Sequence, residues 1–391
     1  MTTDPSSRLH RRVVDIDSLG EFDAVAAFSR SMDGWRVRHV DLTERTSVLL
    51  RLAPAGALFL GARLAAPAIV HLEAGGALVY PDVPGAPVDE FRSALYGPDE
   101  LYDGLAAAGY PATPDARVYA WSQERGGAEQ LVAKALHDAS IGAALDSWLA
   151  ADRRPVVGVM GGHAVQRGDA AYADAAELGR LLASAGFLVA TGGGPGAMEA
   201  ANLGAHLSTA PPDAVGEAAA MLAAVPSFRP SVGAWAQAAQ AVRTRWAGGA
   251  SSLGVPTWHY GHEPPNLFAS HVAKYFQNSV REATLLERCT GGVVFLPGAA
   301  GTVQEVFQDA CENFYADAGL AAPMVLVGRQ HWTERVPAWP LLRALATGRD
   351  FERSIALVDD VTAAADVIAA HAAGAANGTV GTSKLAPPPQ Q

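Results

Sequence analysis

The sequence has little cysteine and very little lysine. Its 391 residues include 2 cysteines, Cys289 and Cys311, too few for a disulfide framework or a zinc knuckle. Reduced thiols of this kind are typical of cytoplasmic proteins. Lysines stand only at positions 134, 274 and 384, so few side chains are available for Schiff-base chemistry. We expect Lys274 to be a surface residue of a helix.

Basic residues are outnumbered by acidic ones, and long apolar runs are missing. The formal net charge of −11 argues against nucleic acid as a partner, because phosphate backbones require clustered Lys and Arg. The most apolar stretch, 55–80, is interrupted by Arg63, His71 and Glu73, so we expect no membrane-spanning helix. The N-terminus shows no secretory signal. These features predict a cytoplasmic protein that interacts with neither membranes nor nucleic acid.

The length and the pattern of elements indicate two domains. Residues 1–150 show short α/β elements, in which 36–42, 56–64 and 117–121 favour strands, and no repeat of fixed period stands out. The polar, proline-terminated step at 152–155 marks the predicted boundary. Residues 151–373 form the second domain, with a helical insertion over 208–249. Residues 374–391 are rich in Gly, Ala, Ser and Pro and predict a disordered tail.

Strands alternate with helices from residue 156 onward. The pattern predicts strands at 156–160, 187–190, 252–258, 293–296, 324–327 and 355–358. It predicts helices at 169–186, 197–207, 267–288, 303–315, 339–346 and 362–371. This alternation is typical of an α/β fold with a parallel sheet flanked by helices.

Three of these strands end in glycine-rich turns: Gly161-Gly162, Gly192–Gly196 and Pro297–Thr302. Ligands of open parallel sheets bind beyond the carboxyl ends of the strands, and glycine permits close approach to the backbone. A single such turn can also reflect tight packing alone. The turns match neither the dinucleotide fingerprint nor the Walker pattern. In the third turn Thr302 opens a helix and can hold a phosphate with the neighbouring N–H groups.

Two segments give a specific resemblance. Val280-Arg281-Glu282-Ala283, followed by the run from Pro297 to Glu305, resembles the LONELY GUY (LOG) family, often mislabelled lysine decarboxylase-like. The run Gly192–Asn202, GGGPGAMEAAN, resembles a variant found in larger bacterial members. The similarity covers about residues 155–330. It implies a modified Rossmann fold, a homodimer or higher homo-oligomer, and hydrolysis of the N-glycosidic bond of a nucleoside 5′-monophosphate.

The resemblance also assigns roles to individual residues. Arg281 and Glu305 match the catalytic pair of the family. The residues that match substrate-binding positions, together with the first turn, are Gly161, Gly162, Gly193, Gly194, Gly196, Met198, Pro297, Gly298, Ala299, Ala300, Gly301 and Thr302. No cofactor is implied. His259 and His262 have no third ligand at metal spacing, so we expect no metal.

Several alternatives remain open. Ala299 stands where the family has glycine, and Glu282 where short members often have lysine, which puts a cytokinin-type substrate in doubt. A non-catalytic nucleotide sensor or carrier of the same fold is the second hypothesis. Asp309 and Glu312 are interpreted as solvated or interface residues. The segment 256–266 either stacks on a base or buries its aromatic rings, and Trp235 either lines a lid or packs in the core.

Overall fold

The computed structural model describes residues 13–259, 263–317 and 320–376. Contacts divide the chain into two compact units, Met1–Ser93 with Gly126–Ser140, and Ala94–Arg125 with Ile141–Gln391. The predicted domain boundary after residue 150 stays a prediction, but residues 94–125 and 141–150 pack with the second unit. The proposed tail beyond residue 376 lies outside the described residues. None of the described helices is long and apolar enough to cross a membrane.

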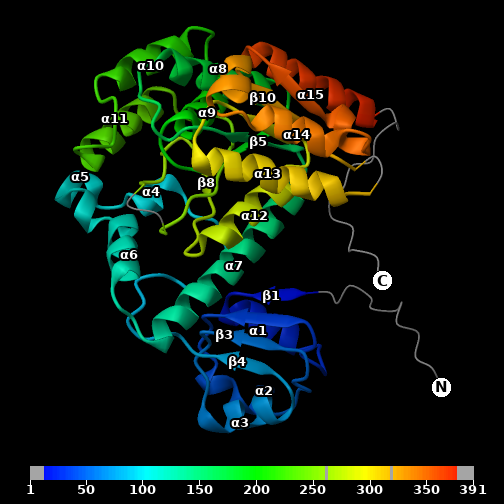
Figure 1. The fold of residues 1–391 in the computed structure, drawn as a ribbon. Coiled ribbons are helices and arrows are strands. Elements are labelled where there is room, and N and C mark those ends of the chain that lie inside the picture. The colour runs from blue at the N-terminus through cyan, green and yellow to red at the C-terminus, as the bar shows by residue number, and fades with distance from the viewer. Residues whose placement is uncertain (1–12, 260–262, 318–319, 377–391) are drawn as a thin grey trace. The chain divides into compact units, whose positions relative to one another are not determined.

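The first unit is a parallel sheet with strand order β1-β2-β3-β4 (Figure 1). Its elements are β1 Val14–Ile16, α1 Leu19–Ala26, β2 Trp35–Arg38, α2 Thr46–Leu49, β3 Leu58–Leu60, α3 Ala66–Ala74 and β4 Leu78–Tyr80, with the first half of α7 Ala128–Asp152. Helix α1 begins at Ser18, whose side chain accepts a hydrogen bond from the Glu21 N–H. Phe22, Trp35, Val37, Phe59 and Leu72 are buried in its core.

The strands of this unit follow one another at nearly constant spacing. Val14 pairs with Trp35, Arg36 with Leu58, and Leu58 with Leu78, so the register advances by 20–22 residues per strand. This spacing lies within the range of about 20–45 residues for solenoid repeats, in which each strand–helix unit buries its apolar face against its neighbours. The expectation that no fixed period exists is therefore wrong for this unit.

The second unit is built on a seven-stranded sheet with order β11-β10-β9-β5-β6-β7-β8, and all of its strand pairs are parallel. The strands are β5 Val156–Met160, β6 Leu188–Thr191, β7 Leu253–Gly254, β8 His271–Val272, β9 Gly292–Phe295, β10 Met324–Val327 and β11 Ile355–Val358. The helices are α4 Pro98–Leu101, α5 Leu105–Ala108, α6 Pro114–Gln123, α8 Ala170–Ser184, α9 Ala197–His206, α10 Ala214–Ala223, α11 Val232–Arg245, α12 Asn278–Arg288, α13 Ala300–Tyr315, α14 Ala338–Ala346 and α15 Val361–Ala376. The predicted mixed α/β fold with a parallel sheet flanked by helices is confirmed.

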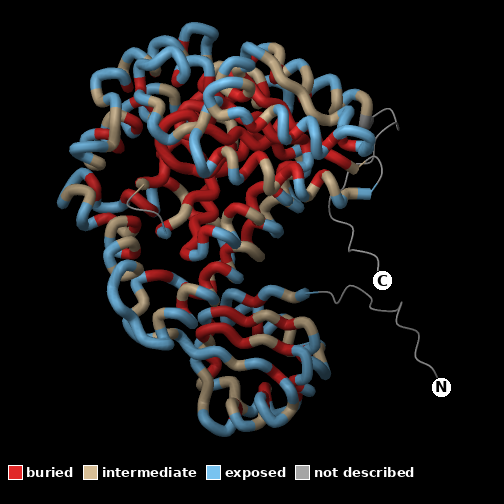
Figure 2. Tube along the Cα trace, viewed as in Figure 1, coloured by how far each residue is buried: buried red, intermediate tan, exposed pale blue. Residues whose placement is uncertain are grey.

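The strand order reverses direction between β5 and β9. The chain runs outward from β5 through β6 and β7, and later outward from β9 through β10 and β11. Helix α8 packs against α9 and α15, whereas α13 packs against α12 and α14. Right-handed crossovers running in opposite directions place these two groups of helices on opposite faces of the sheet. The sheet between them is buried (Figure 2) except at its edges, where all of β11 and His271 of β8 are half-buried. A crevice for a ligand is expected at the point of reversal.

Two predicted elements are wrong. Residues 117–121 lie in helix α6, which begins after Thr113, whose hydroxyl accepts the Ala116 N–H. Thr113 and the proline after it form a helix start, which overrides the strand preference of the residues at 117–121. The predicted helix 267–288 is helical only from Asn278; its first part holds the short strand β8. The helical insertion is present as α10 and α11.

Lys274 also differs from the expectation of a surface residue. It is 1% exposed, and its ammonium lies 2.6 Å from Asp115, a fully buried carboxylate on α6. Trp258 Nε1 donates to the same oxygen at 2.9 Å, and Tyr110 Oη donates to the other at 2.6 Å. Burial lowers the pKa of Lys274. This buried cluster joins segment 94–125 to the β8 edge of the sheet.

Gly204 in α9 is a test of the close packing between α8 and α9. A Cβ at this position would lie 1.7 Å from the Ala176 carbonyl oxygen, so the backbones would have to separate. We expect Gly204→Ala to lower the free energy of unfolding by about 1–3 kcal/mol. Gly216→Ala in α10 is the matched control, because a Cβ there meets nothing within 4 Å, and it should stabilise by about 0.5–1 kcal/mol. Denaturation midpoints that shift equally in both variants would contradict the close packing.

Candidate functional site

The three glycine-rich turns lie together at the carboxyl ends of β5, β6 and β9, with β5 in the middle. The Gly162 N–H donates to the Pro297 carbonyl at 3.2 Å, and the Ala197 N–H donates to the Gly162 carbonyl at 3.2 Å. A Cβ on Gly161 would lie 3.0 Å from the Cβ atoms of both Ala197 and Leu296. Glycine at this central turn therefore allows the three turns to touch one another.

The turn after β9 forms a small cradle over the first turn of α13. A Cβ on Gly298 would lie 2.2 Å from Thr302 Oγ1, so only glycine leaves room for this hydroxyl beneath the loop. Thr302 is buried, whereas Pro297, Ala299, Ala300 and Gly301 are exposed. The first N–H groups of a helix have no partner within the helix and carry partial positive charge. An exposed loop with these amides has the chemistry of an anion site.

Ala299 fits this turn without strain. Its φ of −114° lies in the ordinary region for any residue, so the departure from glycine does not close the cradle. The positive φ values fall instead in the β6 turn, at Gly193 with +72° and Gly196 with +77°. Gly196 also approaches the Gly162 carbonyl oxygen, which would be 2.6 Å from a Cβ.

Arg281 connects the β6 turn to α13. Its Nη2 would be 2.9 Å from a Cβ on Gly192, where Met198 Sδ also packs, and its Nη1 donates to Glu305 Oε1 at 3.3 Å. The buried Nε of Arg281 has no hydrogen-bond partner among the described residues. Glu305 is 8% exposed on α13. The structure thus brings together the predicted pair Arg281 and Glu305 with the predicted turns.

Burial raises the pKa of Glu305, and Arg281 opposes this shift while the nearby Glu282 adds to it. Glu282 is itself buried, and it accepts hydrogen bonds from Asn278 Nδ2 at 2.6 Å and from Gln304 Nε2. Asp309 is fully buried, so the expectation of a solvated residue is wrong for it, and Glu312 is half-buried. The helix face from Glu305 to Asp309 points into the protein because α12 and α13 pack together.

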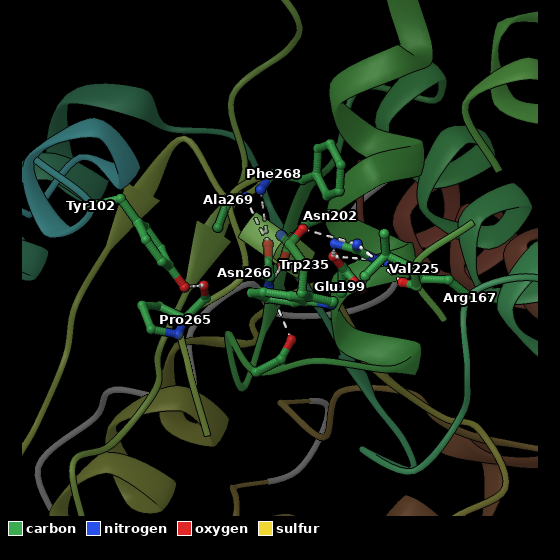
Figure 3. Close-up of polar contacts among 11 residues, drawn as sticks. Tyr102, Arg167, Glu199, Asn202, Val225, Trp235, Pro265, Asn266, Phe268 and Ala269 are labelled. Carbon is green, nitrogen blue, oxygen red and sulfur yellow. Dashed lines mark hydrogen bonds and ion pairs between the residues drawn. The ribbon is translucent and has the colours of Figure 1, made fainter. Parts of the chain in front are cut away.

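Several site residues were not identified from the sequence. Thr191 Oγ1 donates to Asn202 Oδ1 at 2.7 Å and accepts the Gly193 N–H at 3.0 Å. Asn266 donates from its backbone N–H to the Gly193 carbonyl at 2.8 Å and from Nδ2 to Asn202 Oδ1 at 3.0 Å. Asn202 is the last residue of the GGGPGAMEAAN run, which was the available signal. These amides fix the shape of the β6 turn (Figure 3).

A second buried ion pair lies beside this turn. Glu199, also in the run, accepts from Arg167 Nε at 3.2 and 3.1 Å, and Arg167 Nη1 donates to the Trp235 carbonyl at 3.0 Å. Both charged side chains are 1% exposed (Figure 3). Since Arg167 lies in the loop after β5 and Trp235 lies in α11, the pair attaches the helical insertion to the site.

His331 lies against the β9 cradle and was also missed. Its Nε2 is 3.0 Å from the Gly298 carbonyl oxygen and 3.3 Å from the Gly298 nitrogen.

The structure decides part of the question whether segment 256–266 stacks on a base or buries its aromatic rings. Trp258 is 2% exposed and stacks on Phe276 with ring centroids 4.6 Å apart, so it is a core residue. His262 lies outside the described residues, and no metal-binding cluster occurs among those described.

One protein-family model matches part of the second unit. The model of the SLOG cluster4 family (LDcluster4) matches residues 154–210, which contain the first two turns. No curated protein sequence matches the chain significantly. Membership of the LONELY GUY family itself stays a prediction.

Solved structures similar to the chain include molybdenum cofactor proteins. The Moco carrier protein from Chlamydomonas reinhardtii is 19% identical, with 56% of this chain and 99% of that chain covered and a TM-score of 0.35. The molybdenum cofactor binding protein from Rippkaea orientalis is 16% identical, with 56% and 97% covered and a TM-score of 0.36. The structural genomics target TM1055 is 20% identical, with 54% and 97% covered and a TM-score of 0.32.

The raised pKa of Glu305 predicts a pH dependence of stability. Below the ordinary pKa of 4.5 the carboxyl is protonated in both the folded and the unfolded chain, and the folded state gains from this. As the pH rises through the folded-state pKa, that contribution is lost. We therefore expect the melting temperature of the parent to fall relative to Glu305→Gln between pH 4.5 and the folded pKa, and the difference to be constant above it. A difference that is independent of pH would contradict the raised pKa.

Proposed function

We propose that the second unit binds a small phosphorylated ligand of the nucleoside monophosphate class and acts as a carrier or sensor of it. The observation that carries the proposal is the cradle formed by Gly298 over Thr302, with exposed backbone at the start of α13. The phosphate would lie on these N–H groups and on the Thr302 hydroxyl. Because the recognition groups are mainly backbone, a chain with a net charge of −11 can still bind an anion.

Charge close to the cradle is balanced rather than strongly positive. Arg281 is the cation nearest the turns, and Glu305 pairs with it at 3.3 Å. A carboxylate beside a phosphate is unfavourable, since like charges repel. The ion pair and the raised pKa of Glu305 both lessen that repulsion. The ribose of a nucleotide is the part of the ligand that Glu305 would face.

Binding can be tested at the cradle by isothermal titration calorimetry with AMP, GMP, CMP, UMP, IMP and ribose 5-phosphate. Thr302→Val keeps the shape of the side chain but removes the hydroxyl, and we expect it to weaken every phosphorylated ligand by about 1–3 kcal/mol, the cost of one lost hydrogen bond to a charged group. The nucleosides without phosphate should bind much more weakly. Thr333→Val is the control, since Thr333 is a half-buried threonine on the segment after β10 whose hydroxyl donates to the Arg329 carbonyl. Equal affinity for nucleosides and nucleotides would overturn the proposal.

A second candidate function is hydrolysis of the N-glycosidic bond, and the Arg281–Glu305 pair favours it. Cleavage passes through an oxocarbenium-like sugar, and a carboxylate near the ribose can stabilise that charge or orient the attacking water. Arg281 would hold the carboxylate in place. Bound phosphate would supply the binding energy that positions the sugar. The products would be free base and ribose 5-phosphate.

Turnover is separated from binding by Glu305→Ala. If the unit is an enzyme, purified protein releases base from at least one nucleotide, and this substitution lowers the rate by about 100-fold or more while binding persists. Chromatography of the free base measures the reaction. If the unit is a carrier or sensor, nucleotides bind but no base appears with the parent or the variant. The second result would remove the catalytic candidate and leave the binding proposal intact.

A further inference from the structure

A cavity of about 280 Å³ lies beside the β6 turn. Its walls come from the loop after β5 and the β6 turn, with Gly196 between them, and from the helical insertion through Phe228, Arg229 and Trp235. Glu263 lines the remaining side. Small-molecule sites usually occupy about 300–1,000 Å³. This cavity therefore has room for one ring system of a ligand and not for a complete nucleotide.

Backbone contacts through the central turn link the lining of the cavity to the phosphate cradle. Gly196 lines the cavity and approaches the Gly162 carbonyl, and the Gly162 N–H donates to the Pro297 carbonyl at the start of the cradle. The proposal requires that a ligand with its phosphate on the cradle extends past Gly162 toward the cavity. The base of a nucleotide is the part that remains to be placed.

The lining of the cavity matches a flat, polar ring. Phe228 packs edge to face against Trp235, with ring centroids 6.5 Å apart, and its own half-buried ring supplies the aromatic surface of the lining. Trp235 is 1% exposed and its position is fixed because its carbonyl accepts from Arg167. The Glu199 carboxylate also lines the cavity, but Arg167 already occupies both of its oxygens. The charged groups left to read a ligand are Arg229 and Glu263.

We infer that this cavity, formed by the helical insertion and the first two turns, binds the base of the ligand and prefers a guanine-type base to adenine. The inference rests on the proposed function. A carboxylate such as Glu263 only accepts hydrogen bonds, and guanine offers it the adjacent N1–H and 2-amino donors. Arg229 only donates, and guanine offers it the O6 and N7 acceptors. Adenine presents an amino group in place of O6 and an acceptor in place of N1–H.

The rim of the cavity keeps Glu263 available for this role. The carboxylate of Glu263 lies beside His163, whose Nδ1 is 3.7 Å from Glu263 Oε1, beyond hydrogen-bond distance. The side chain of Glu263 is 34% exposed, so part of it is open to a ligand. The other oxygen lies beside Gly194, because it would be 3.5 Å from a Cβ there. The same glycine belongs to the β6 turn.

The experiment compares GMP, AMP and ribose 5-phosphate by isothermal titration calorimetry on the full chain. We expect the parent to bind GMP at least about tenfold more tightly than AMP, the discrimination of one bidentate contact. Glu263→Gln should remove most of this preference and leave ribose 5-phosphate unchanged. Arg229→Gln should weaken GMP in the same way. Glu217→Gln is the matched control, since Glu217 lies on α10 of the same insertion, pairs with Arg245 and does not line the cavity.

The outcomes separate this inference from the proposed function. If ribose 5-phosphate and both nucleotides bind but GMP and AMP bind equally, or if Glu263→Gln and Arg229→Gln leave the preference intact, the assignment of the cavity is overturned and the phosphate site stands. If neither nucleotide nor ribose 5-phosphate binds the parent, the proposed function falls and the inference falls with it. Unchanged melting temperatures of the variants show that a lost preference is not a loss of folding.

Discussion

The site depends on how closely the β5 turn approaches its two neighbours. The Gly162 N–H and carbonyl are each bonded to a different turn, to Pro297 on one side and to Ala197 on the other. Gly161 and Gly196 permit this only because neither carries a Cβ, which would lie 3.0 Å or less from neighbouring atoms. The strand order makes the contact possible, since β5 lies between β9 and β6 at the reversal of the sheet. A side chain at either position would separate the cradle from the β6 turn, and with it the proposed phosphate position from the proposed base position.

Buried ion pairs then fix the parts that the backbone does not. Arg281–Glu305 joins α12 to α13, Arg167–Glu199 joins the loop after β5 to α9, and Lys274–Asp115 joins segment 94–125 to the sheet edge. Each pair gains Coulomb energy in a medium of low polarity but loses hydration, so the net contribution to stability is small or uncertain in sign. Loss of one partner is costly, because the other charge remains buried. The pairs therefore restrict where these segments can lie more than they add to total stability.

The sequence was informative where one local pattern decides the structure. The alternation of apolar strands and helices predicted every strand of the seven-stranded sheet except β8, which lies in a segment predicted as helix, and the glycine-rich runs predicted the three turns. Long-range partners could not be predicted in the same way. The sequence around Lys274 predicts a surface charge, because no neighbouring residue indicates that Asp115, far away in the chain, lies 2.6 Å from its ammonium. Helical spacing alone places Asp309 on a solvated face of α13. In the structure α12 packs against α13, and Asp309 is fully buried. The 20–22-residue repeat of the first unit escaped because strand register, and not residue identity, is what recurs.

The helical insertion contributes to the site through side chains, whereas the turns contribute through their backbone. The turns are backbone structures, and their chemistry is set by glycine, by helix α13 and by the geometry of the sheet. The insertion contributes side chains, Phe228, Arg229 and Trp235, to one wall of the cavity next to them. Changes in Phe228 and Arg229 can alter which ring fits without moving the backbone proposed to hold a phosphate, because Arg167 anchors α11 through both the Trp235 carbonyl and the face of its ring. A fold of this kind can keep one anion site and vary the rest of the ligand, which is what a specificity-determining insertion requires.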